Sequence, residues 1–387
     1  MRRRTHRRTE GGQGPVTDTV GERYRSLPEL AKDAANDGVP VIGFVGTDTP
    51  VELIDATGAL AYRLGSVAGP LLAEARHLLG SAVDYPALSI LTQILSGELD
   101  FLRGIVVSRD CQASLRLFYV LRQLQVQGRA VPESHLVDLL HLPRESTARY
   151  NLSQVRRVSA TVAEWTGSAV HSSDVRYAID RREQVRTALL GVQTRRRGTE
   201  PTVTGTDALR LHAVAQRSLP EEALDFIRSV DPVPARDGAS LRLFVTGSTQ
   251  DEDTNYDAVE SAGAHIVGED HSWGDLALGI APAVIESGHL DDMFDALARA
   301  RQRGGPAAQT SGLRDRADYS THEIAASGAQ AVLSFARAND PAPEWDFPML
   351  QTTPTLILRG AEQCWSSGDL ADAVGALRAT QLEGSRS

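Results

Sequence analysis

Cysteine is scarce in this chain of 387 residues, which contains only two. Cys111 and Cys364 lie far apart and form no CxxC pair, so a disulfide framework and a zinc ribbon are both excluded. Isolated thiols of this kind are typical of a reducing compartment, and we expect a cytoplasmic protein.

Other absences narrow the class of protein further. Lys32 is the only lysine, which excludes a P-loop lysine or a Schiff-base lysine almost everywhere in the chain. No run approaches the roughly 18 apolar residues that a membrane-spanning helix needs, so no membrane contact is expected. The formal charge of −10 repels phosphate backbones and disfavours nucleic acid as the main partner.

The composition that remains is that of a soluble globular protein, with 41% hydrophobic and 23% charged residues. The length predicts two domains or one large two-lobed enzyme. Residues 1–25 are polar and begin with a short arginine-rich run, which predicts a disordered basic tail. Contact of this run with nucleic acid or lipid is the alternative.

Short apolar runs alternate with helical segments in both halves of the chain. Buried strands are predicted within residues 39–46, 103–108, 134–143, 241–247, 264–268, 330–335 and 355–358. Helices are predicted for residues 49–63, 113–124, 147–165, 174–192, 256–262 and 370–381, and a loop for residues 191–205. This order favours an α/β fold with two parallel-sheet lobes, residues 26–145 and 236–387, joined by a helical segment, residues 146–235. The proline-rich and glycine-containing stretch 231–238 is the best candidate boundary.

The common nucleotide and hydrolase fingerprints are missing from the chain. It has no GxGxxG, no GxxxxGK[ST] and no GxSxG, so the α/β pattern alone indicates neither NAD nor ATP binding nor ester hydrolysis. Candidate sites must therefore come from individual loops at the strand ends, where open α/β sheets bind ligands.

One candidate loop, residues 108–112, places Cys111 where a strand passes into a helix. The helix dipole and Arg109 are expected to favour the thiolate of Cys111. The alternative is that Cys111 is a small buried residue that fills a helix–strand contact.

The second candidate loop, residues 269–274, gathers Glu269, Asp270, His271 and Ser272 after another strand. These side chains could bind a metal or polarise a substrate carbonyl, whereas a solvated turn ending at Gly274 is the alternative. Cys364 and four further histidines are more simply explained as structural residues, since none has metal-ligand spacing; these histidines are His77, His135, His141 and His265.

Read together, residues 39–380 resemble the 2-hydroxyacyl-CoA dehydratase family, which includes benzoyl-CoA reductase subunits. The resemblance lies in the order and spacing of several segments, namely 49–60, 99–114, 142–145, 165–167, 242–248, 260–274 and 345–348. It implies flavodoxin-like or Rossmann-like lobes and a [4Fe-4S] cluster held by three cysteines from three loops. Thiolates suit such a cluster because soft sulfur matches iron.

Only one of the three implied ligand positions carries a cysteine. Cys111 matches the middle ligand, whereas no cysteine lies near residues 72–76 and Ser272 stands at the third position. A single thiolate cannot hold a standard cluster, so Cys111 would need unusual partners from residues 269–271, or a sister subunit would hold the cluster.

The resemblance therefore implies a subunit of a heteromeric enzyme that removes water from a 2-hydroxyacyl thioester through a radical, with an ATP-dependent activator as electron donor. Cys111 would bind the cofactor and metal, and Glu269, Asp270, His271 and Ser272 would line the opposite wall as catalytic residues. The alternatives are a cluster-free homologue that binds a partner or ligand, and a benzoyl-CoA reductase-like subunit.

Overall fold

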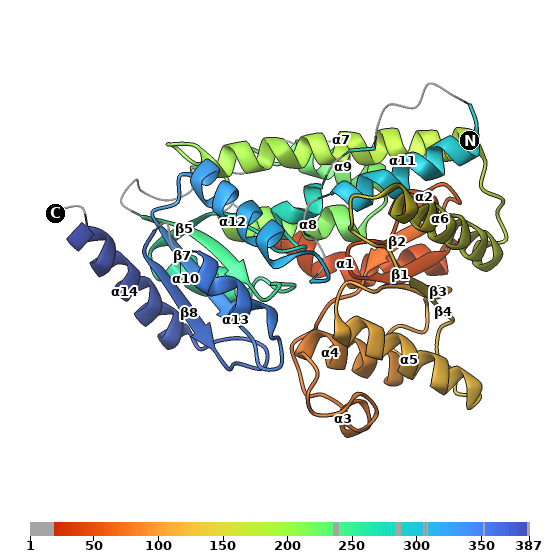
Figure 1. Ribbon diagram of the computed structural model, residues 1–387, viewed down its shortest axis with the longest axis horizontal. Helices are drawn as coiled ribbons and strands as arrows, with labels where there is room; N and C mark the ends of the chain where they lie inside the picture. Colours follow the sequence, from red (N-terminus) through yellow and green to blue (C-terminus); the bar gives the residue numbers. More distant parts are fainter. Residues whose placement is uncertain are drawn as a thin grey trace, which may run out of the picture.

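The computed structural model describes residues 19–234, 240–279, 281–282, 288–304, 306, 309–350 and 353–384. Two four-stranded parallel sheets form the centres of two lobes, as Figure 1 shows. The first contains β1 (Val41–Val45), β2 (Leu60–Arg63), β3 (Gly104–Ser108) and β4 (Ser134–Val137). The second contains β5 (Leu241–Gly247), β6 (Ala264–Glu269), β7 (Ala331–Ala336) and β8 (Thr355–Arg359). The predicted α/β fold with two parallel-sheet lobes is confirmed.

Both sheets have the same strand order. The first runs β2-β1-β3-β4 and the second β6-β5-β7-β8, which is the flavodoxin-like arrangement. In each sheet the chain changes direction beside its first strand, between β1 and β3 or between β5 and β7. Loops at such a point diverge and leave a crevice at the carboxyl ends of the strands, where ligands bind.

Helices cover both faces of the first sheet. One face packs against α3 (Ala73–Leu79), α4 (Tyr85–Leu95), α5 (Gln112–Val126) and the end of α1 (Thr19–Asn36). The other packs against α2 (Val51–Asp55), α6 (Glu145–Thr166), the start of α7 (Ser172–Arg197) and α11 (Leu290–Arg303). Burial on both faces explains why these strands are almost continuously apolar.

The second sheet is covered in the same way. The largest core joins it to the later part of α7 and to α8 (Gly205–Arg217), α9 (Pro220–Ser229), α10 (Thr254–Ser261) and α14 (Ser367–Gly384). A smaller apolar cluster lies on its other face, where α12 (Leu313–Ser327) contributes Ile324. The short elements α13 (Ala342–Asp346), η1 (Asp275–Leu278) and η2 (Phe347–Met349) complete the described secondary structure.

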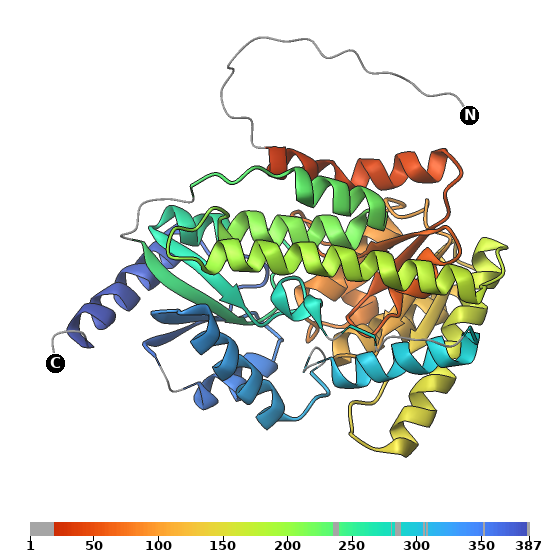
Figure 2. The same cartoon turned by 90° about the horizontal axis from the view of Figure 1, so that it is seen from above.

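Three helices tie the lobes together. Figures 1 and 2 both show α7 running along the two lobes, and it contacts α2 at one end and β6 at the other. Helix α11 follows β6 in the chain, yet its Met293 and Phe294 pack in a core of the first lobe. Conversely, Val20 and Leu27 of α1 lie in the largest core of the second lobe.

Several predicted boundaries are wrong. Residues 19–25 belong to α1 and not to the tail, because Val20 is buried; residues 1–18 lie outside the described residues. The predicted helix 49–63 stops at Asp55, and Leu60–Arg63 forms β2, whose four side chains are all buried beside β1. Residues 191–197 continue α7 instead of forming a loop.

The predicted boundary at residues 231–238 lies partly outside the described residues, which omit 235–239. In the part of the chain that the structure covers, no helix combines the length and the apolarity needed to span a bilayer.

Candidate functional site

The carboxyl ends of the two sheets face each other across a cavity of about 140 Å³, here called the inter-lobe cavity. Its walls come from strand ends in both lobes, which is where the shared topology predicts a ligand. The first lobe contributes Gly46, Arg63, Asp110 and Cys111, and the second contributes Asp251, Ser272, Trp273 and Arg337.

Cys111 lies on the wall of this cavity, at the start of α5. Its Sγ accepts a hydrogen bond from the backbone N–H of Ser114 at 3.4 Å and so caps the helix. Burial, followed by the negative charge of Asp110, raises the pKa of the Cys111 thiol to about 12. The expectation of a thiolate is therefore wrong. Arg109 pairs with Asp138 at 3.2 Å instead of stabilising the sulfur.

Asp110 is held close to the sulfur by the loop after β1. Its Oδ2 accepts a hydrogen bond from the backbone N–H of Thr47 at 3.1 Å. Gly46, with φ of +86°, permits this approach, since a Cβ there would lie 2.5 Å from Asp110 Oδ2. Burial and the charge of Asp48 raise the pKa of the Asp110 carboxyl to about 6.

Of the four side chains predicted to face Cys111, only Ser272 lines the inter-lobe cavity. Asp270 accepts hydrogen bonds from Thr246 at 2.7 Å and from Ser320 at 2.5 Å, within the second lobe. His271 Nε2 lies 2.8 Å from the hydroxyl of Tyr256, and burial, followed by the charge of His212, lowers its pKa to about 3. The expected wall of acidic and imidazole groups is therefore wrong for Asp270 and His271, because both point into the second lobe.

Glu269 is also turned away from the cavity, into a buried ion-pair network. It accepts a hydrogen bond from Arg196 Nη1 at 2.6 Å, and Arg196 Nη2 donates to Asp275 at 2.6 Å. Both side-chain pairs are almost completely buried. Although burial opposes ionisation, the charge of Arg196 holds the pKa of Asp275 below its usual range.

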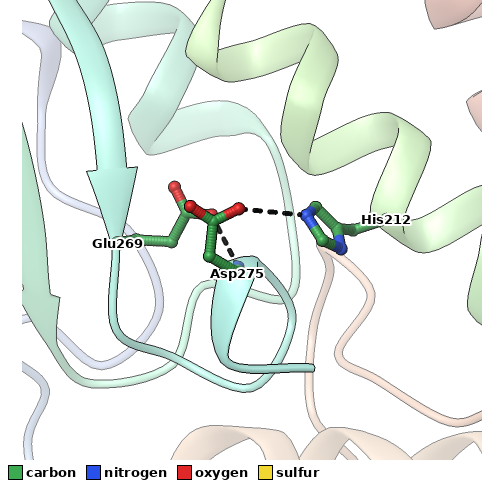
Figure 3. A group of neighbouring side chains, drawn as sticks. All are labelled: His212, Glu269 and Asp275. Atoms are coloured by element: carbon green, nitrogen blue, oxygen red, sulfur yellow. Dashed lines mark hydrogen bonds and ion pairs between the residues drawn. The ribbon is translucent and has the colours of Figure 1, made fainter. Parts of the chain in front are cut away.

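His212, Glu269 and Asp275 bring ligand atoms within 4.8 Å of one another. Figure 3 shows the three side chains, which come from α8, β6 and η1. This geometry alone could hold a cation. Arg196 already binds both carboxylates, and Arg197 donates to Asp275 at 3.1 Å. A metal ion would have to displace these guanidinium groups, so the cluster is best described as an ion-pair network.

Arg63, at the end of β2, is a site residue that the sequence interpretation missed. Its Nη2 donates to Ser272 Oγ at 2.8 Å and its Nη1 to the Ser272 carbonyl at 2.5 Å. The guanidinium also donates to Gln216 and lies 4.3 Å from the ring centre of Trp273. Arg63 therefore binds the first lobe to the turn that follows β6 in the second lobe.

The two lobes are also joined beside Arg63. Arg337 Nη2 lies 2.9 Å from Asp84 Oδ2, and the backbone N–H of Ser66 donates to Asp251 at 2.6 Å. Gly65 allows this approach, because a Cβ would lie 2.9 Å from atoms of Arg217 and Trp273. Buried polar contacts thus fix the position of the cavity walls.

A second cavity, of about 210 Å³, lies on the other side of Arg63 and Ser272, which line both cavities. We call it the α7 cavity, since residues 179–189 of that helix form one wall. The other described walls come from β1 and the loop after it, from α2, α8, η1 and α11, and from residues 281–282.

The described residues do not fit a cubane cluster. Cys111 is the one thiol among the described residues that line the inter-lobe cavity, and Ser272 Oγ accepts a hydrogen bond from Arg63. Cys364 lines a different, much smaller pocket with Tyr85 and Glu252, and burial raises its pKa to about 11. One protonated thiol and one engaged hydroxyl supply too few soft ligands for iron.

Two flavodoxin-like lobes with a polar cavity between their strand ends define a two-lobed α/β protein. The chain matches the family described as 2-hydroxyglutaryl-CoA dehydratase, D-component, over residues 47–350. The chain belongs to this family. No curated protein matches it.

Proposed function

We propose that the protein is a subunit of a 2-hydroxyacyl-CoA dehydratase-like enzyme that removes water from a 2-hydroxyacyl thioester. The observation that carries the proposal is the meeting of Cys111 and Ser272, from different lobes, on one cavity at the strand ends. The family match over residues 47–350 supports the class of reaction.

The misfit of the ligand set supports a role for this chain that does not include holding the cluster. A homologous sister subunit would hold the [4Fe-4S] cluster, and an ATP-dependent activator would supply electrons to that subunit. This chain would complete the substrate pocket, where Arg63 and the Cys111 thiol can donate hydrogen bonds to a substrate oxygen. Ser272 orients Arg63, while Glu269, Asp270 and His271 position the turn that carries Ser272.

The experiment is anaerobic purification of this chain alone and together with a homologous chain that carries the three cysteines. Iron and acid-labile sulfide are measured in both preparations, and dehydration of 2-hydroxyacyl thioesters is assayed with the activator. We expect iron only in the complex, and Cys111→Ala in this chain should leave that iron in place. A full complement of iron in the isolated chain, lost in Cys111→Ala, would overturn the division of roles.

A second candidate is a cluster-free homologue that binds a ligand without redox chemistry. The engagement of Ser272 Oγ by Arg63 and the raised pKa of Cys111 favour it. Absence of iron and of dehydration from both preparations would support this candidate. Reduction of an aromatic thioester in the same assay would instead indicate a benzoyl-CoA reductase-like subunit.

A further inference from the structure

Arg63 is a buried cation without a carboxylate partner among the described residues. Its residue surface is only 4% exposed, and its hydrogen-bond acceptors are the neutral oxygens of Ser272 and Gln216. Its Nε is buried and has no hydrogen-bond partner within the described part of the chain. Burial lowers the pKa of Arg63 to about 10, so the group remains charged at neutral pH.

The other arginines on the α7 cavity are all neutralised. Arg182 pairs with Asp55 at 2.6 Å, Arg186 with Glu183 at 2.7 Å, and Arg301 with Glu52 at 2.7 Å. These are all the arginines among its described lining residues apart from Arg63. The cavity thus presents one unneutralised guanidinium.

An isolated buried charge has a large desolvation cost unless a counter-charge is close by. Here the acids whose charges act on Arg63, Asp110 and Asp251, form no ion pair with it. The missing counter-charge therefore belongs to something that enters the site. Because a guanidinium matches a carboxylate in shape and charge, an organic carboxylate is the favoured ligand.

The charged residues that line the two cavities indicate which of them an anion would enter. Among the described residues, the inter-lobe cavity is lined by four aspartates and two arginines, whereas the α7 cavity has four arginines and three acids. Asp48, the one acid there without an arginine partner, lies 2.9 Å from His141 Nε2. An anion is therefore favoured on the α7 side of Arg63.

The remaining wall of the α7 cavity is apolar and defines the rest of the ligand. Its apolar side chains include Phe44, Val51, Ile179, Leu189, Leu276 and Leu278. A cavity of roughly 150 Å³ holds benzene, so the 210 Å³ here suits a ligand slightly larger than benzene.

We propose that the α7 cavity binds an organic carboxylate, with the carboxylate on Arg63 and a short hydrocarbon chain against the apolar wall. This inference does not rest on the proposed function, since it concerns the isolated chain and needs neither iron nor a sister subunit. It assigns Arg63 a ligand in the α7 cavity in addition to the substrate oxygen proposed for it in the inter-lobe cavity.

The test is titration of the full chain with sodium hexanoate and with hexanamide, its neutral isostere, followed by calorimetry and tryptophan fluorescence. We expect saturable binding of hexanoate alone, and Arg63→Gln should weaken it by roughly tenfold or more. Arg63→Lys, which keeps the charge but loses the planar fork, should weaken it less. Arg109→Gln is the matched control, because Arg109 lines neither cavity, and it should bind as the wild type does.

A thermal unfolding curve checks that Arg63→Gln is folded, and added hexanoate should raise the midpoint of the wild type but not of this variant. Equal binding of hexanamide and hexanoate, undiminished binding by folded Arg63→Gln, or no saturable binding by the wild type would each overturn the proposal. Loss of dehydratase activity in the complex would leave these binding results unaffected.

Discussion

Arg196 and Arg63 are both buried arginines beside the turn that follows β6, yet their surroundings are opposite. Arg196 is completely buried and binds Glu269 and Asp275, each at 2.6 Å. Arg63 is 4% exposed and binds only neutral oxygens and the face of Trp273. The first arrangement is complete within the fold, whereas the second lacks a counter-charge.

The difference distinguishes a charged side chain that stabilises the lobe, Arg196, from one that is available to bind a ligand, Arg63. A buried ion pair whose partners are all present is strongly destabilised when one partner is removed, because the others become uncompensated charges. A buried charge without a counter-charge carries its desolvation cost in the folded state already, so its removal relieves that cost and offsets the loss of its neutral hydrogen bonds. The comparison therefore predicts a large loss of stability at Arg196 and little change at Arg63 for the same substitution.

The largest effect is expected for Arg196→Gln. This change leaves the buried carboxylate of Glu269 without a cation and leaves Asp275 paired with Arg197 alone, and we expect a loss of about 3–5 kcal/mol in the free energy of unfolding. Chemical denaturation at pH 7 measures it. Arg129→Gln is the control, since its pair with Glu74 is 46% exposed on both sides and should change stability by less than about 1 kcal/mol. Similar losses in the two variants would remove the basis of the comparison.

A smaller effect is expected for Gly65→Ala, next to Arg63. The new Cβ would lie 2.9 Å from Trp273 and Arg217, so the turn bearing Ser272 must shift. We expect a loss of about 2 kcal/mol, typical of overpacking. Gly80→Ala is the contrast for backbone strain without overpacking. Gly80 has a positive φ that alanine adopts only with strain, whereas an added Cβ there meets no atom within 4 Å. Wild-type stability of Gly65→Ala would mean that the lobes are not held as closely as described.

The next expected effect depends on pH. The folded pKa of Asp110, about 6, lies above its ordinary value, so its ionisation destabilises the fold as pH rises through the interval from about 4 to about 6. Asp110→Asn removes this cost and should increase the free energy of unfolding by about 2 kcal/mol at pH 7, with no gain at pH 4. Urea titrations at the two pH values measure the difference. An equal effect at both would show that Asp110 ionises normally.

A purely kinetic effect is expected at Cys111. With its pKa raised to about 12, the thiol should react with iodoacetamide far more slowly at pH 7.5 than an ordinary cysteine, and the rate should still be rising at pH 9.5. Mass spectrometry of Cys364→Ser, which leaves Cys111 as the one thiol, measures the rate. Rapid alkylation at neutral pH would instead indicate a thiolate in the inter-lobe cavity.

Much of the fold was predictable because parallel strands buried on both faces are short, continuous apolar runs. The run Val41–Val45 and the run Ala331–Ala336 are of this kind. The strand Leu60–Arg63 was not predicted, because Leu60 and Tyr62 also fit the apolar face of a helix that continues from Leu53 and Ile54. Pairing with β1 decided the outcome, and that contact is not visible in local sequence.

The sequence predicts only those site residues that directly follow a buried strand. Cys111 and Ser272 follow β3 and β6 and do share one cavity. The orientations of Glu269, Asp270 and His271 depend on partners far along the chain, such as Arg196 and Ser320, which sequence neighbours do not indicate. Arg63 could not be predicted as a site residue, because its hydrogen-bond partner Ser272 lies 209 residues away in the sequence.

The most direct test is the free energy of unfolding of Arg63→Gln, measured without added ligand beside Arg196→Gln. If the missing counter-charge dominates the energetics of Arg63, the relieved desolvation cost offsets the lost hydrogen bonds to Ser272 and Gln216, and the variant should stay within about 1 kcal/mol of wild-type stability. A loss of about 3–5 kcal/mol, equal to that expected at Arg196, would show that the fold itself needs Arg63 and would contradict the account.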